Sequence, residues 1–181
     1  YGDVATGAWA YSSYMGRAYV FYGGAGGIPV SSAASAPRIL TGAATNNYFG
    51  RAMAMADFNG DGFGDLAVGA NGNSSNRGLV QIYLGSMTGI PAGASSSIPG
   101  ETTPTSTSKF GSLMVAGDVN QDGYADLIAS AISYFPGGQA YIFHGTGSGI
   151  SAADAGGAAR RISGEAITDF NLGGGLAVGN F

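Results

Sequence analysis

The stretch 57–65 (DFNGDGFGD) carries oxygen-bearing side chains at a spacing that suits a hard cation. Calcium takes six to eight oxygen ligands, which a tightly curled loop can gather at short range. Gly62, at the sixth position, tolerates the positive φ angle that such a curl requires. The expected ligands are the side chains of Asp57, Asn59, Asp61 and Asp65 and the main-chain carbonyl of Phe63.

The same pattern returns 61 residues later in the stretch 118–126 (DVNQDGYAD). Ordinary turns also favour Asp, Asn and Gly, but two copies with a matching ninth aspartate favour metal binding. Several carboxylates within nine residues repel one another, and a divalent cation removes that repulsion. We therefore expect about two Ca²⁺ ions per chain. The second set of expected ligands is Asp118, Asn120, Asp122 and Asp126, with the carbonyl of Tyr124.

These loops differ from the EF-hand, which needs a bidentate glutamate at its twelfth position and a helix after it. The twelfth positions here are Val68 and Ala129. The apolar runs 66–70 and 127–131 that follow the loops are typical of short buried strands.

The composition narrows the class of protein. The chain has 181 residues, of which 45% are hydrophobic and 10% are charged, so we expect one folded domain rather than a disordered chain. The net charge of −4 argues against a nucleic-acid partner. The absence of cysteine excludes disulfides and thiol chemistry. No apolar run is long enough to predict a membrane span.

The chain repeats itself with a period of about 60 residues. The segment 63–70 resembles 1–8 and 124–131, and aromatic-rich strands are expected at 16–23, 78–85 and 138–145. Short outer strands are expected at 38–42, 97–100 and 161–164. The unit restarts at 49–50, 110–111 and 172–173, with first strands at 53–56, 113–116 and 176–179.

Four short strands per repeat predict an all-β fold built from the blades of a β-propeller. Residues 1–181 form a single propeller segment of about three four-stranded blades. The expected blade repeats are 1–48, 49–109, 110–171, and 172–181 as the first strand of a further or ring-closing blade.

Two short motifs resemble those of the FG-GAP repeat. Phe49-Gly50 and Phe110-Gly111 precede the first strands, and Val68-Gly69-Ala70 follows the first loop. The FG-GAP family builds the β-propeller at the head of integrin alpha chains and occurs in many bacterial extracellular proteins. The resemblance implies that each of the two ligand sets above holds one calcium ion. The sequence departs from the family pattern at Leu172-Gly173, where leucine replaces the phenylalanine of the Phe-Gly pair.

Three blades alone would leave open strand edges. The ring is expected to close by strand exchange or by further blades, and one form of exchange is a homodimer that completes a six-bladed ring. Asp3 matches only the tail of the acidic motif, so we expect no third calcium site.

A few other residues could carry function. His144 is the only histidine, and a surface or loop-packing role is favoured for it. Trp9, Tyr11 and Tyr14 could stack on sugars or anchor a partner, although packing between blades is favoured. Solvated surface positions are expected for Glu101, Asp154, Glu165, Asp169 and the pair Arg160-Arg161.

The sequence favours a calcium-binding, non-catalytic recognition or adhesion module at the cell surface or outside the cell, in which calcium is structural. Its partner would be a protein or a glycan bound by the variable loops. Two alternatives stay open, a carbohydrate-binding lectin and the scaffold part of an extracellular hydrolase or lyase, because fold alone does not decide function.

Overall fold

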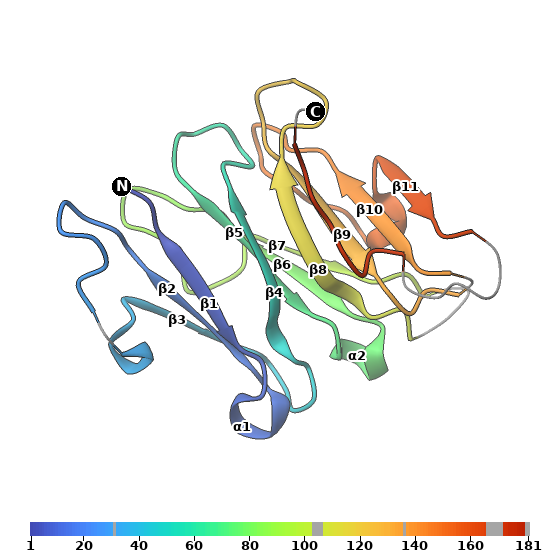
Figure 1. The fold of residues 1–181 in the computed structure, drawn as a ribbon, viewed down its shortest axis with the longest axis horizontal. Coiled ribbons are helices and arrows are strands. Elements are labelled where there is room, and N and C mark those ends of the chain that lie inside the picture. The colour runs from blue at the N-terminus through green and yellow to red at the C-terminus, as the bar shows by residue number, and fades with distance from the viewer. Residues whose placement is uncertain (31, 103–106, 136, 166–171, 180–181) are drawn as a thin grey trace.

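The computed structural model describes residues 1–30, 32–102, 107–135, 137–165 and 172–179, and it shows an all-β architecture of three antiparallel sheets (Figure 1). The first sheet contains β1 (Val4–Ala8), β2 (Arg17–Phe21) and β3 (Arg38–Thr41). The second contains β4 (Phe49–Ala56), β5 (Asp65–Ala70), β6 (Leu79–Tyr83) and β7 (Ser96–Pro99). The third contains β8 (Phe110–Gly117), β9 (Asp126–Ala131), β10 (Gln139–Phe143) and β11 (Arg160–Ser163).

Each sheet is a meander in which every strand pairs with the next one along the chain. The second and third sheets have the four strands expected of a propeller blade, which confirms the predicted fold class. Among the described residues, helical structure is limited to four short turns: α1 (Tyr11–Tyr14), α2 (Asn73–Asn76), Ala33–Ser35 and Ala155–Gly157. No described helix has the length and apolar character that a membrane crossing requires.

The core lies between neighbouring sheets rather than within one sheet. Side chains alternate between the two faces of a strand, so Leu66 and Val68 of β5 join the cluster shared with the first sheet. Ala67, between them, joins the cluster shared with the third sheet. Burial on both faces explains why this strand is a continuous apolar run.

The sheets are joined by a repeated parallel bridge. In each case the glycine directly before β2, β6 or β10 pairs with the residue that starts the next repeat. Gly16 bridges Phe49, and Gly78 bridges Phe110. Gly138 bridges Leu172 in the same way. The adjacent glycine has a positive φ in each case, of 81° at Gly50 and 86° at Gly173.

The segment 176–179 differs from its expected strand, since it has no strand assignment. β4 and β8 pair with β5 and β9, whereas no strand in the described residues follows this segment and could pair with it. Its backbone still runs beside β8 (Figure 1). Val178 lies so close to Gly117 that a Cβ added to the glycine would be 2.6 Å from a Val178 methyl carbon.

The joint between the second and third blades leaves no room for a side chain at Gly69. A Cβ there would lie 2.2 Å from the Gly111 carbonyl oxygen, which belongs to rigid backbone. We expect Gly69→Ala to lower the free energy of unfolding by about 2–3 kcal/mol, because the blades must separate to relieve the overlap. Urea denaturation measures this. Gly93→Ala is the control, because no atom lies within 4 Å of its added Cβ; equal effects of the two substitutions would contradict the tight joint.

Candidate metal centre

The two acidic loops connect the first strand of a blade to the second, β4 to β5 and β8 to β9, at the same end of the sheets (Figure 1). In the first loop the Asp57 carboxylate accepts hydrogen bonds from the backbone N–H groups of Gly60, Asp61 and Gly62, at 2.7, 3.1 and 2.8 Å. These bonds wrap the chain around Asp57. Gly60 and Gly62 have φ angles of 71° and 86°, which the curl requires.

The third and fifth positions of this loop are also held by hydrogen bonds. Asn59 Oδ1 accepts a hydrogen bond from the Asp61 N–H at 3.2 Å, and Asp61 Oδ1 accepts one from Phe63 at 2.8 Å. The Asn59 amide also donates to Asp61 Oδ2 at 2.9 Å. Hydrogen bonds therefore link the side chains at positions 3 and 5 to each other, and the side chain at position 1 to the backbone of the curl.

The second loop repeats this geometry. Asp118 accepts hydrogen bonds from the N–H groups of Asp122 and Gly123 at 3.2 and 2.9 Å. Asn120 donates to Asp122 at 2.7 Å. The Tyr124 N–H, and after it the Asn120 side chain, stabilise the carboxylate and lower the pKa of Asp122. The two loops thus have matching oxygen-rich sides.

The ninth aspartate of each loop has a structural role that sequence reasoning missed. Asp65 is fully buried, and its two oxygens accept hydrogen bonds from the N–H groups of Phe58 at 2.8 Å and Gly85 at 2.7 Å. Asp126 accepts equivalent bonds at 2.9 Å from each of two N–H groups, those of Val119 and Gly145. These carboxylates tie the loop to the end of the third strand. Their ligation of a metal stays a prediction, as does that of the Phe63 and Tyr124 carbonyls.

The electrostatics of the first loop favour a positive charge nearby. Burial raises the pKa of Asp65, and the negative charges of Asp61 and Asp57 raise it further, while the Gly85 and Phe58 N–H groups oppose this rise. A divalent cation among these oxygens would relieve the repulsion.

The donor set fits a hard, oxygen-preferring cation rather than a transition metal. Among the described residues, no three Asp, Glu, His or Cys side chains gather at metal-binding spacing. The first loop instead offers the carboxylates of Asp57 and Asp61 with the amide oxygen of Asn59. A carboxylate has about four lone-pair sites, so bonds to backbone N–H groups leave others for a metal.

The two loops touch each other across the joint between blades. The Ala125 N–H donates a hydrogen bond to the Asp57 carbonyl oxygen at 3.0 Å. The Tyr124 ring lies over Gly60, where an added Cβ would be 2.8 Å from the ring edge. The shape of one loop therefore depends on the position of the other.

The only histidine packs against the second loop, which agrees with the loop-packing role expected for it. His144 Nδ1 lies 3.2 Å from Asp126 Oδ1, and the His144 side chain is 34% exposed. The Asp126 carboxylate is also held by two backbone N–H groups.

The expectation that Glu101 is a solvated surface residue is wrong. Glu101 is buried and forms a salt bridge to Arg161 Nη1 at 2.9 Å, 60 residues further along the chain. It also accepts a hydrogen bond from the Tyr134 hydroxyl at 3.1 Å. A buried carboxylate needs such partners, and their separation in sequence hid the pairing. Of the other acidic residues assigned to the surface, Asp169 lies outside the described residues.

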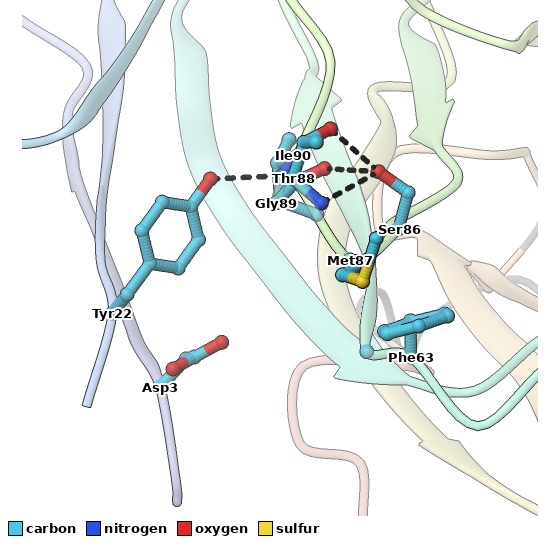
Figure 2. A pocket seen from close by; sticks show the side chains of 9 residues that line it. Asp3, Tyr22, Phe63, Ser86, Met87, Thr88, Gly89 and Ile90 are labelled. Atoms are coloured by element: carbon cyan, nitrogen blue, oxygen red, sulfur yellow. Dashed lines mark hydrogen bonds between the residues drawn. The ribbon is translucent and has the colours of Figure 1, made fainter. Parts of the chain in front are cut away.

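A cavity of about 390 Å³ lies beside the first loop, between the first and second sheets (Figure 2). Its wall includes a turn in which the Ser86 hydroxyl contacts Thr88 and Gly89. The Tyr22 hydroxyl crosses the sheet boundary and accepts a hydrogen bond from the Ile90 N–H at 2.8 Å. Asp3 is the one carboxylate among the residues that line this cavity.

Comparison with known families decides the relationship. The family described as "FG-GAP repeat" matches residues 49–83 and 110–143, which contain both acidic loops and the three strands around each. The chain therefore contains FG-GAP repeats. The matched segments begin at Phe49 and Phe110, where the parallel bridges join the blades.

The curated relatives that match this chain are much longer proteins. Rat phosphatidylinositol-glycan-specific phospholipase D is 35% identical over 151 residues, which cover 76% of this chain and 17% of the relative. Human integrin alpha-7 is 37% identical over 119 residues, covering 63% of this chain and 10% of the relative. Chicken integrin alpha-V is 45% identical over 87 residues, covering 46% and 8%. This FG-GAP chain therefore spans less than a fifth of the length of these relatives.

The buried and exposed aspartates of the first loop should respond differently to substitution in calcium-free buffer. Asp65→Asn places an amide NH₂ against one of two backbone donors, so we expect a loss of about 2 kcal/mol in the free energy of unfolding. Asp61→Asn, at an exposed position, should change it by less than about 0.5 kcal/mol. Chemical denaturation with chelator present tests both. A larger effect for Asp61→Asn would contradict the structural role given to Asp65.

Proposed function

We propose that this FG-GAP chain is a calcium-stabilised, non-catalytic module for extracellular recognition or adhesion. The observation that carries the proposal is the pair of matching loops, each with two carboxylates and an amide oxygen on one side of a curl. Each loop is also fastened to its blade by a buried aspartate. The recurrence of this arrangement in both blades is expected if each loop binds an ion.

A bound calcium ion would supply fixed positive charge to each loop and would act on stability rather than on a reaction. In the first loop Asp57, Asn59 and Asp61 would hold it, with Asp65 and the Phe63 carbonyl as further predicted ligands. The residues Asp118, Asn120 and Asp122 would act alike in the second. Because the loops contact each other through Ala125 and Asp57, ordering them would also hold the two blades together.

Two observations support recognition rather than catalysis. Integrin alpha chains are among the relatives, and the resemblance to them implies a binding module outside the cell. The single histidine contacts the carboxylate of Asp126, which also holds the second acidic loop in place. The similarity to a phospholipase D keeps an enzyme scaffold as the alternative that assays should address.

Calorimetric titration of chelator-stripped protein with Ca²⁺ tests the metal sites. We expect about two sites per chain, and an increase in unfolding free energy of about 2.7 kcal/mol per site when free calcium is 100 times the dissociation constant. Asp61→Asn should remove the first site and Asp122→Asn the second. Arg160→Gln, a substitution on β11, serves as the control. Absence of binding to folded protein would refute the calcium sites.

We further propose that an inner strand covers β1. β1 lies at the edge of its sheet, whereas its equivalents β5 and β9 each pair with an inner strand. A second copy of the chain or a further blade would supply the strand. Sedimentation of the 17.9 kDa chain tests the homodimer. A mass near twice that value supports strand exchange between copies, and a stable monomer contradicts it.

A further inference from the structure

The ends of the sheets opposite the acidic loops carry a cluster of aromatic rings (α1 end, Figure 1). Trp9 and Tyr14 stack with ring centroids 6.0 Å apart, and Tyr48 lies 5.3 Å from Tyr14 and 6.0 Å from Trp9. Trp9 is 38% exposed and Tyr14 is 44% exposed. The expected packing of Trp9 between blades is therefore only partial, because a large part of the ring faces solvent.

Two cations border these rings. The Arg51 guanidinium lies 5.1 Å from the centre of the Trp9 ring. Arg51 projects from a bulge in β4, because Phe49 pairs with Ala70 while Met53 pairs with Val68. Lys109 lines the same hollow as Arg51. Within the described structure, neither cation lies within 4 Å of a carboxylate.

Three neighbouring hollows share some of these residues in their walls. A hollow of about 430 Å³ includes Trp9 and Arg51, and one of about 170 Å³ includes Arg51, Tyr48 and Lys109. A third, of about 460 Å³, shares Tyr48 and Asn76 with the second and is otherwise lined mainly by Asn, Ser, Thr and Gly residues. Their lining residues come from all three sheets and from the segment after the third.

The fold does not require these side chains. Trp9 follows β1, and the positions that follow β5 and β9 are occupied by Asn71 and Ile132. Arg51 likewise corresponds to Ser112 and Gly174, two residues after the phenylalanine or leucine of each bridge. Three unlike residues satisfy each structural position, so a tryptophan and an arginine placed side by side indicate a binding role.

We propose that this aromatic–cationic face, formed by Trp9, Tyr14, Tyr48, Arg51, Asn76 and Lys109, binds an acidic oligosaccharide whose sugars carry carboxylate or sulfate groups. This inference rests on the recognition function proposed above and names its ligand class. Half-exposed rings offer flat surfaces to the C–H faces of sugars. Arg51 and Lys109 pair with the anionic groups, and side-chain amides satisfy hydroxyls, since they both donate and accept.

Charge and lining favour a saccharide over a peptide. The chain carries a net charge of −4, so the attraction for an anion is local to this face rather than general. Peptides usually add to a free strand edge or place apolar side chains in a groove. The hollow beside Tyr48 is instead lined by polar side chains and glycine.

The test measures binding by isothermal calorimetry to polygalacturonate oligomers, dextran sulfate and neutral dextran. We expect binding to at least one acidic polymer and none to dextran. Binding to polygalacturonate alone assigns carboxylated sugars, binding to dextran sulfate alone assigns sulfated sugars, and binding to both supports the shared anionic chemistry. Trp9→Ala and Arg51→Gln should each weaken binding at least about tenfold.

Two control variants keep the test specific. Tyr1→Ala removes an aromatic side chain that is 90% exposed, and Arg160→Gln removes a cation on β11, so both should bind like the wild type. Calcium stoichiometry measured on the same samples separates the two proposals and shows that each variant is folded. Intact calcium sites without binding to either acidic polymer would overturn the ligand class alone. Three other results would also overturn the ligand class. They are binding that Trp9→Ala and Arg51→Gln leave unchanged, equal binding to dextran, and, with poly-glutamate as an added probe, binding to this acidic peptide in place of the acidic sugars.

Discussion

A buried carboxylate that bridges two backbone N–H groups holds each described loop in place. Asp65 joins Phe58, at the start of its loop, to Gly85, at the end of the third strand, and Asp126 makes the equivalent bridge. Hydrogen bonds to a charged acceptor contribute about 1.5–3 kcal/mol each. Asp3 accepts one such hydrogen bond in the described structure, from the Gly23 N–H at 2.8 Å, so one half of the bridge recurs in the first sheet.

This constraint separates two roles within one loop motif. The ninth aspartate faces inward and fixes where the loop begins and ends, while the earlier positions form the oxygen-rich curl outside. The ninth aspartate therefore fixes the position of the loop, and the earlier residues supply the negative charge of its outer side. A similar division holds in the described blades, because backbone bridges and buried alternating side chains define them, while the residues at the strand ends opposite the acidic loops differ between repeats.

Much of the fold could be predicted from local patterns. The alternation of residues around β5, the aromatic runs of β2, β6 and β10, and the repeated Phe-Gly pairs are all visible over a few residues, and they gave the blades and their strand order. The acidic curl was also visible, since positions 1, 3 and 5 are neighbours in sequence. The exact partners of Asp65 were hidden, because Gly85 lies 20 residues away.

Features that depend on distant contacts escaped sequence reasoning for the same reason. Glu101 looked like a solvated loop residue because its partner Arg161 belongs to the next repeat. The contact between the Trp9 and Tyr48 rings depends on how the first two sheets meet. The segment 176–179 has the apolar pattern of a strand, but a strand also needs a partner, and that requirement is not written in its own residues.

The bridges between blades are formed by backbone atoms, with glycine beside them, so they do not depend on particular large side chains. Such joints favour evolution by duplication of whole repeats. A gene segment that encodes one repeat encodes both kinds of residue that form the bridges. The aromatic or leucine residue that starts the unit pairs with the repeat before it, and the glycine before the third strand pairs with the repeat after it. Tandem duplication of that segment would add a blade that already fits its neighbours. Surface residues could then diverge in each copy without compensating changes at the joints.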